Sequence, residues 1–132
     1  MWGRDKLVAA SPRAYVLEAS RLMLEHGATA VVVVEGDLLI GILTVHDVVL
    51  RVVAAGRDPG TVCIEDVMTR EPVTVGPDAT LGHALTLMRV NGFGHLPIVE
   101  AGRPVGLVLA RSALDPELED FVSEERRRQA FD

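Results

Sequence analysis

Basic residues are scarce in this sequence, and their scarcity excludes one class of partner. The 132 residues include 13 lysines and arginines against 19 aspartates and glutamates, which gives a formal net charge of −6. Lys6 is the only lysine, and the one basic run, Arg126 to Arg128, follows two glutamates in a polar tail typical of a solvated helix face. Nucleic-acid binding needs a basic face that neutralises phosphates. We therefore expect no nucleic-acid partner.

Cysteine and long apolar runs are also nearly absent. Cys63 is the single cysteine, so an internal disulfide and a structural zinc site are both excluded, which favours a reducing cytoplasm. The longest apolar run, Ala30 to Val34, is too short to cross a bilayer. The N-terminus has charges at residues 4 to 6 and no apolar stretch typical of a signal peptide. We expect a cytoplasmic protein with no membrane partner.

The histidines and the cysteine form no catalytic or metal-binding pattern. His26, His46, His83 and His95 lack the spacing of metal ligands, and Cys63 has no neighbouring histidine to activate it. No phosphate-binding glycine loop of a known type is present. Since no nucleophile, base and orienting group can be assembled, we expect no enzymatic activity and no metal.

What the sequence does contain is an internal repeat. Displacing the chain by 65 residues aligns it with itself without a gap over about forty residues. Identical residues then coincide at Pro12/Pro77, Ala14/Ala79, Ala19/Ala84, Leu22/Leu87, Met23/Met88, Gly27/Gly92, Val34/Val99, Glu35/Glu100 and Gly41/Gly106.

Each copy of the repeat predicts the same series of elements. Apolar residues at helical spacing predict helices, which end at Gly27 and Gly92, where a C-cap favours glycine. Uniformly apolar, valine-rich runs predict strands covered on both faces. The expected order is a short strand (Leu7–Ala9; Pro72–Val75), a helix (from Val16; from Leu81), two strands joined by a hairpin turn (Ala30–Glu35 and Leu38–Leu43; His95–Glu100 and Pro104–Leu109), and a second helix (Val45 to about Ala55; from about Arg111).

This order predicts a mixed α/β (α+β) fold made of two β-α-β-β-α repeats. One repeat of about 50 residues buries too little surface to be stable alone. We therefore expect the two copies to be related by a pseudo-twofold axis and packed sheet to sheet. The expected parts are a first repeat (1–56), a linker (57–64), a second repeat (65–115) and a helical tail (116–132) with Leu118, Phe121 and Val122 at helical spacing.

Several motifs of both copies resemble those of one known family. They are Gly41 to Asp47, which matches a pattern of glycine, two apolar residues, Thr or Ser, two further residues and Asp, together with Asp66–Thr69, Pro77–Leu81, His95–Val99 and Gly106–Val108. The repeat resembles a CBS domain, and the tandem, over about residues 2 to 115, resembles a CBS pair or Bateman module.

The resemblance implies a regulatory function. CBS pairs generally sense adenosine-containing ligands such as AMP, ADP, ATP or S-adenosylmethionine, and are usually fused to an enzyme or transporter. Here we expect the stand-alone type, which assembles as a homodimeric disc and passes its signal to an unidentified protein. The nucleotide is then a regulatory ligand, and no cofactor is expected. The alternative is a ligand-free structural or protein-interaction module with degenerate clefts.

Thr44 and Asp47 have two interpretations. In the first they form a capping box at the start of the helix expected from Val45, each side chain accepting the other residue's backbone N–H. In the second, implied by the resemblance, the hydroxyl and the carboxylate bind the ribose, whose diol supplies two donors. The two interpretations are compatible, because each side chain has spare lone pairs.

The second copy departs from this pattern. The repeat aligns Leu109 with Thr44 and Ser112 with Asp47. Leucine cannot accept a hydrogen bond from ribose, and serine is short and uncharged. We therefore expect at most one competent nucleotide site, with the other cleft empty or degenerate.

The resemblance places the second wall of the Thr44 and Asp47 site in the second copy. The adenine ring would lie among four apolar side chains, and the alternative interpretation makes each of these an ordinary core residue. They are Ile42, Met68, Val73 and Phe93.

The phosphate end of the ligand would lie near Gly94 and His95. The alternative makes His95 a strand histidine bonded to backbone. As a phosphate ligand, histidine is a weak and pH-dependent cation. Arg103 and Arg111 are the nearest further candidates in the sequence. With so few fixed cations, a ligand with two phosphates or fewer fits this site better than ATP.

Overall fold

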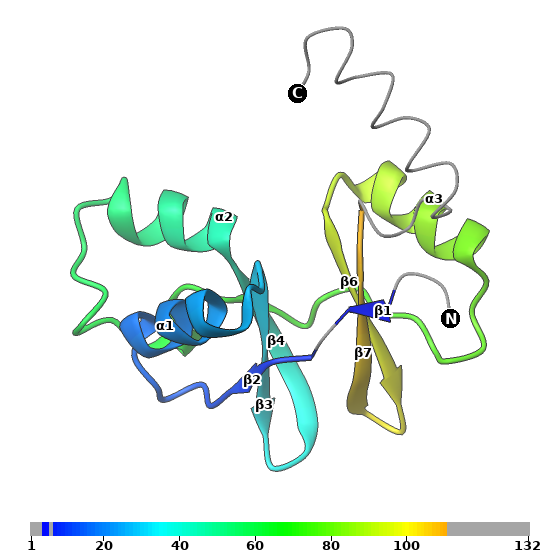
Figure 1. The fold of residues 1–132 in the computed structure, drawn as a ribbon, viewed down its shortest axis with the longest axis horizontal. Helices are drawn as coiled ribbons and strands as arrows, with labels where there is room; N and C mark the ends of the chain where they lie inside the picture. The colour runs from blue at the N-terminus through cyan, green and yellow to red at the C-terminus, as the bar shows by residue number, and fades with distance from the viewer. Residues whose placement is uncertain (1–3, 6, 111–132) are drawn as a thin grey trace, which may run out of the picture.

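The fold consists of two sheets that stand side by side with helices on their outer sides. The computed structural model describes residues 4–5 and 7–110, and in Figure 1 α1 and α2 flank one sheet while α3 flanks the other. The first sheet has the strand order β2-β3-β4-β5 and the second the order β1-β7-β6. The elements are β1 (Arg4–Asp5), β2 (Ala9–Ala10), α1 (Val16–His26), β3 (Ala30–Glu35), β4 (Leu38–Thr44), α2 (Val45–Val48), a π-helical stretch η1 (Val49–Val53), a 3₁₀ turn η2 (Ile64–Asp66), β5 (Thr69–Arg70), α3 (Leu81–Asn91), β6 (His95–Glu100) and β7 (Arg103–Leu109).

The backbone pairing confirms the repeat. The β-bulge at Val33/Val34 in the first hairpin recurs at Ile98/Val99 in the second, 65 residues later. The hydrogen bond from Val45 N–H to Thr29 O (3.0 Å) likewise recurs from Ala110 N–H to Gly94 O (2.9 Å). The two copies are therefore one structural unit, repeated about a pseudo-twofold axis as expected.

The helices and hairpins follow the sequence prediction closely. β3 and β6 have the predicted bounds, and β4 and β7 differ from them by one residue. Gly27 (φ 64°) and Gly92 (φ 74°) are left-handed C-caps of α1 and α3, a conformation in which glycine carries no Cβ penalty. The helix that starts at Val45 continues through η1 and ends at Val53, slightly before the expected position. The expected helix near Arg111 and the tail 116–132 lie outside the described residues.

The short first strand of each repeat is where the prediction was wrong. β2 covers Ala9–Ala10 instead of Leu7–Ala9, and within Pro72–Val75 Val75 alone makes an isolated bridge, to Ile98. Two strands that were not predicted, β1 and β5, lie closer to the start of each repeat. Each of them pairs with a strand of the other repeat. β1 pairs antiparallel with β7 of the second repeat, while β5 pairs antiparallel with β4 of the first. Each repeat therefore completes the sheet of the other.

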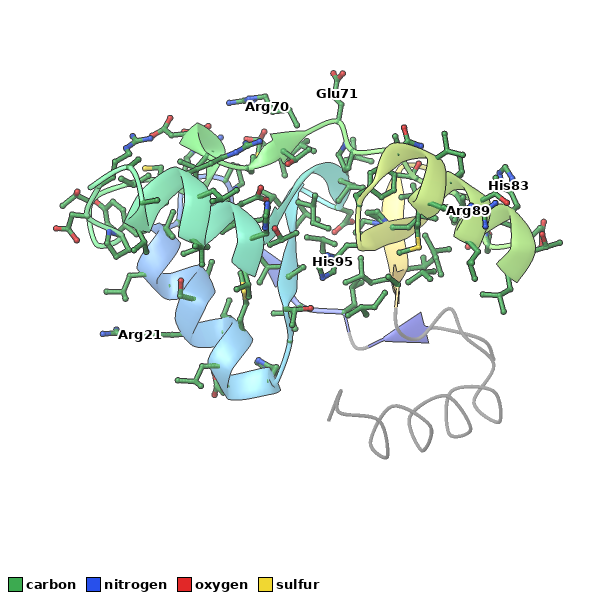
Figure 2. The ribbon with its side chains drawn as sticks, turned by 90° about the horizontal axis from the view of Figure 1, so that it is seen from above. Arg21, Arg70, Glu71, His83, Arg89 and His95 are labelled. Atoms are coloured by element: carbon green, nitrogen blue, oxygen red, sulfur yellow. The ribbon has the colours of Figure 1, made fainter. Side chains whose placement is uncertain are left out.

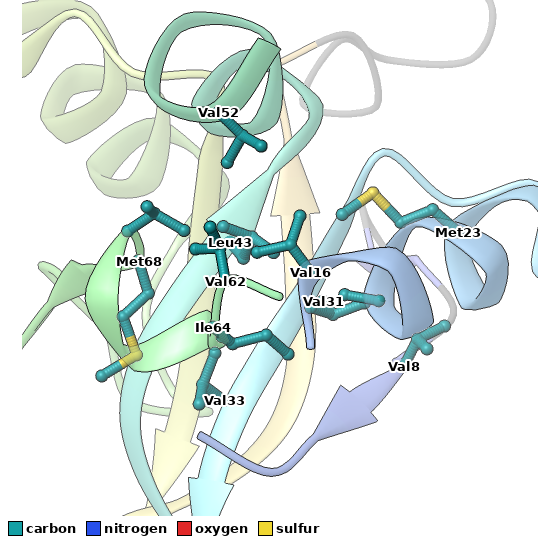
Figure 3. Packing of buried hydrophobic residues seen from close by; sticks show 12 residues of the cluster. Val8, Val16, Met23, Val31, Val33, Leu43, Val52, Val62, Ile64 and Met68 are labelled. Atoms are coloured by element: carbon teal, nitrogen blue, oxygen red, sulfur yellow. The ribbon is translucent and has the colours of Figure 1, made fainter. Parts of the chain in front are cut away.

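Three apolar clusters hold this arrangement together. The largest packs α1 and the helix from Val45 against β3 and β4, and Figure 3 shows Val16, Val52 and Leu43 meeting in it. A second cluster packs α3 against β6 and β7. The third joins the two sheets and consists of Ala30, Ile42, Leu107 and Leu109, with Leu7 packed against it. This third cluster provides the predicted sheet-to-sheet packing.

Candidate functional site

A cleft of about 500 Å³ opens between the two repeats. Three segments line it: the end of β4 with the first turn of α2, the chain from β5 onward, and the turn between α3 and β6. The lining residues are Ile42, Thr44, His46 and Asp47 from the first segment, Thr69, Glu71, Pro72 and Val73 from the second, and Gly92, Phe93, Gly94 and His95 from the third. All the predicted site residues are thus brought together here except Met68.

Thr44 and Asp47 form the predicted capping box. Thr44 Oγ1 accepts the backbone N–H of Asp47 at 3.0 Å, and Asp47 Oδ2 accepts the backbone N–H of Thr44 at 3.0 Å. Asp47 is 7% exposed, so its carboxylate is held in a largely desolvated position at the positive end of a helix. The capping interpretation is confirmed, and it fixes both side chains at the wall of the cleft.

Both residues keep hydrogen-bonding capacity beyond the cap. The Thr44 hydroxyl, as an acceptor in the cap, still has its proton to donate. Asp47 Oδ1 makes no hydrogen bond within the described residues, and its nearest cation is Arg51, whose Nε lies 3.8 Å away. That distance is longer than a hydrogen bond. A donor and an acceptor are therefore presented together on one wall.

The opposite wall is anchored by His95. Its Nε2 lies 2.9 Å from Thr29 Oγ1, so the imidazole is held by a hydroxyl from the first repeat. Figure 2 shows His95 between the two halves of the molecule. The sequence interpretation of His95 as a strand histidine bonded to backbone overlooked Thr29, because no sequence pattern connects two residues so far apart.

Met68 is the predicted site residue that does not line the cleft. It is buried in the core cluster of the first repeat, where its Sδ approaches Gly41 closely. Its neighbour Thr69 lines the cleft instead. Side chains alternate along an extended chain, so the residue before β5 points into the core when Thr69 points outward.

The other apolar site residues differ in their surroundings. Ile42 is buried in the cluster between the sheets, and Phe93 packs on the core of the second repeat, so both also serve the core. Val73 is exposed and belongs to the cleft wall. The predicted apolar wall is therefore formed by Ile42, Val73 and Phe93.

Five lining residues were not among the predicted site residues: His46, Thr69, Glu71, Pro72 and Gly92. Glu71 has a left-handed backbone (φ 47°), uncommon for a residue with a side chain, and its N–H donates to Ile40 O at 3.2 Å. Figure 2 shows its side chain pointing outward. Pro72 follows directly, but a proline favours an extended conformation for the residue before it, so the sequence does not predict a left-handed Glu71.

Acidic and imidazole groups provide the ionisable side chains of the cleft. These are Asp47, Glu71, His46 and His95, and no lysine or arginine among residues 4–5 and 7–110 lines it. Arg103 lies at the far end of the hairpin from His95, because β6 and β7 run antiparallel. Arg111 and Ser112 lie outside the described residues, whereas Leu109, their neighbour, is buried between the sheets.

Metal and membrane features are also absent from the described part of the chain. No group of three or more His, Cys, Asp or Glu residues there could hold a metal ion. No helix there combines the length and the apolar character that crossing a bilayer requires.

Comparison with known proteins gives a family match for both repeats. The family model of the CBS domain matches residues 3–54 and again residues 64–116. An inosine-5'-monophosphate dehydrogenase of Korarchaeum cryptofilum is 36% identical over 118 residues, which cover 89% of this chain and 24% of that protein. An uncharacterised protein of Methanopyrus kandleri, MK0525, is 35% identical over 129 residues, 95% of this chain and 66% of that protein. The chain thus spans about a quarter and about two thirds of these relatives.

Solved structures share the fold. An uncharacterised conserved protein from Pyrococcus horikoshii superposes with a TM-score of 0.75 at 31% identity, covering 96% of this chain and 90% of that one. The CBS domain pair of protein MJ0100, crystallised with 5'-methylthioadenosine and S-adenosyl-L-methionine, gives a TM-score of 0.72 at 23% identity, covering 80% and 87%.

Proposed function

Because this chain belongs to the CBS domain family and contains two such domains, we propose that it is a regulatory module that binds an adenosine-containing ligand in the cleft between them. In this proposal a partner protein responds to whether the cleft holds a ligand. The module acts in the cytoplasm, where a single cysteine stays reduced. The module binds and does not catalyse. Among the described residues the cleft lining has no serine, cysteine or lysine, and no hydrogen bond there joins the hydroxyl of Thr44 or Thr69 to a side chain that could act as a base.

The observation that carries the proposal is the pair formed by Thr44 and Asp47. Each hydroxyl of a ribose diol is both a donor and an acceptor. The Thr44 hydroxyl proton and Asp47 Oδ1 are the matching donor and acceptor, already fixed by the capping box. Because the cap orders these side chains before any ligand arrives, binding loses little of their conformational entropy.

The rest of the cleft fits the remainder of such a ligand. Ile42, Val73 and Phe93 supply apolar surface for a purine ring, with Phe93 able to stack on it. Gly94 and His95 lie where the 5' substituent would extend. With two carboxylates and two imidazoles in the lining, we propose a ligand that carries two phosphates or fewer, or none, in preference to a triphosphate.

A panel of ligands tests this function. The thermal unfolding of the wild type and of Asp47→Ala would be measured with adenosine, AMP, ADP, ATP, S-adenosylmethionine, NAD and a cyclic dinucleotide. A ligand present at 100 times its dissociation constant adds about 2.7 kcal/mol to the stability of the folded state. We expect a rise in Tm with at least one adenosine ligand that is lost in Asp47→Ala. Equal rises in both proteins would contradict the site, and no rise with any ligand would contradict the function.

A second candidate function is a protein-interaction module without a ligand. A groove of about 390 Å³ runs between α1 and α2, and apolar residues such as Met23, Leu24, Val45 and Val49 line it. Leu24 is 84% exposed, and Leu50 and Val53 are exposed nearby. We propose that a second copy of this chain covers this apolar face. A homodimer is compatible with both functions, but the open cleft favours ligand binding as the first.

A further inference from the structure

Arg51 lies between the Asp47 carboxylate and the backbone of Val67 and Met68. It lies one helical turn after Asp47, in η1, and its side chain is about half exposed. Its Nη1 donates to the carbonyl oxygens of Val67 (3.0 Å) and Met68 (3.3 Å), while its Nε lies 3.8 Å from Asp47 Oδ1. One guanidinium therefore joins the carboxylate of the cleft to the backbone just before β5.

That backbone leads directly into one wall of the cleft. Val67 and Met68 precede β5, and Thr69, Pro72 and Val73 then line the cleft as the chain crosses to the second repeat. β5 pairs with β4 through two residue pairs, Gly41 with Arg70 and Ile42 with Thr69. The hydrogen bonds of Arg51 therefore add to this short pairing, and to the backbone hydrogen bond from Glu71 N–H to Ile40 O, in holding the crossing segment in place.

The geometry at Asp47 leaves the carboxylate able to bind. At 3.8 Å the attraction to Arg51 is electrostatic and uses none of the hydrogen-bonding capacity of Oδ1. The charge of the guanidinium also offsets part of the cost of keeping this carboxylate buried. Arg51 thus attracts Oδ1, which the capping box already orients, without using the acceptor that a ligand needs.

We propose that Arg51 is a positioning residue that couples occupancy of the cleft to the crossing segment 67–73. This inference rests on the proposed function of the cleft. A ligand that donates to Asp47 Oδ1 also displaces water from the cleft, and the attraction between this carboxylate and Arg51 is stronger in the lower local dielectric. Arg51 in turn donates to the carbonyl oxygens of Val67 and Met68, so the effect reaches the crossing segment. Ligand binding then stabilises the wall of the cleft and the junction between the repeats, and a partner protein can read that change.

The test compares Arg51→Met and Arg51→Lys with Arg70→Met. Arg70 is the matched control, because it is an arginine of the same segment. Its Nη2 also donates to a backbone carbonyl, that of Glu65, at 2.9 Å. Calorimetric titration would measure the affinity for adenosine, AMP and S-adenosylmethionine. We expect Arg51→Met to weaken binding about tenfold, and Arg51→Lys, which keeps the charge, to weaken it less. Arg70→Met should change it less than about twofold. Circular dichroism would confirm that each variant is folded.

Two further measurements distinguish a positioning role of Arg51 from a purely structural role in holding the segment 67–73. In an Asp47→Asn background, adding Arg51→Met should cost clearly less affinity than it does alone, because the arginine acts through the carboxylate. Hydrogen exchange of the Val67 and Met68 amides, which do not line the cleft, should slow when ligand is added to the wild type, but not in Arg51→Met or Arg51→Lys at saturation. The inference would be overturned if Asp47→Asn and Arg51→Met reduced the affinity independently, or if Arg51→Met and Arg70→Met reduced it equally. Either result would leave the proposed function intact. Failure of the wild type to bind any of the three ligands would overturn both.

Discussion

Thr29 and His95 make a side-chain contact between the repeats that has no counterpart on the other side of the pseudo-twofold axis. Thr29 Oγ1 lies 2.9 Å from His95 Nε2. The 65-residue displacement aligns Thr29 with Gly94 and His95 with Ala30, and neither glycine nor alanine has a polar side chain to form the equivalent bond. The two sides of the repeat junction therefore differ, and the side that has this bond also has Thr44 and Asp47.

Removing the Thr29 hydroxyl should destabilise this junction. Thr29→Val keeps the shape of the side chain and removes one hydrogen bond of a half-buried imidazole, which we expect to cost about 1 kcal/mol of unfolding free energy. Urea denaturation checks this value. Thr29→Ser is the control, since it retains the hydroxyl and should unfold near the wild-type midpoint. If the serine and valine variants were equally destabilised, the lost methyl contacts would be responsible and the hydrogen bond would contribute nothing.

The cap and the ligand site at Asp47 should be separable by two substitutions. Asp47→Asn keeps an oxygen that can accept the Thr44 N–H, so we expect it to lose less stability than Asp47→Ala, which loses the cap and about 1 kcal/mol. Both variants lose the charged acceptor and should bind adenosine at least tenfold more weakly. Chemical denaturation and calorimetric titration of the same samples measure the two effects. An Asn variant with full affinity would show that the carboxylate charge is not used by the ligand.

Gly41 should resist substitution for a steric reason. A Cβ at this position would lie 2.5 Å from Met68 Sδ and 3.0 Å from Thr69 O, where β5 pairs with β4. Gly41→Ala must displace the buried Met68 side chain and would crowd the Thr69 carbonyl, so we expect a loss of about 1–3 kcal/mol of unfolding free energy, seen as a lower Tm. Gly82→Ala is the matched control in α3, because a Cβ there meets nothing within 4 Å. It should leave the Tm unchanged or raise it. Equal losses in both variants would contradict the steric explanation.

The parts of the fold that could be predicted from sequence are those specified by neighbouring residues. The apolar spacing of α1 and α3, the glycine caps at residues 27 and 92, and the capping box of Thr44 and Asp47 depend on contacts within four or five residues. The repeat then extended each local prediction to the second copy. Ile42, Thr44, Asp47 and His95 were predicted because the family motifs contain them. Val73, Phe93 and Gly94 were predicted because the resemblance places them at the second wall of the cleft.

What could not be predicted depends on tertiary contacts. β1 and β5 each have two residues, too few for a periodic pattern, and their pairing partners lie in the other repeat. The inward orientation of Met68 depends on the pairing of β5 with β4 beside Gly41. The contact between Thr29 and His95 joins residues 66 apart in the chain. In each case the decisive partner is distant in sequence, and local physical chemistry does not identify it.

The apolar face of α1 and η1 should control the oligomeric state. Leu24, Leu50 and Val53 are exposed there, and burial of large apolar side chains is what stabilises association of two copies. Leu24→Glu places a charge on this face, whose desolvation would oppose association, so we expect it to shift the protein from dimer towards monomer in sedimentation velocity runs. Leu38→Glu is the control, because Leu38 is exposed on the first hairpin, away from the groove. A Leu24→Glu protein that sediments like the wild type, or a wild type that is monomeric at all concentrations, would contradict a second copy as the occupant. The two repeats of one chain form the cleft. Measuring adenosine binding by a monomeric Leu24→Glu protein would then show whether ligand binding requires the dimer.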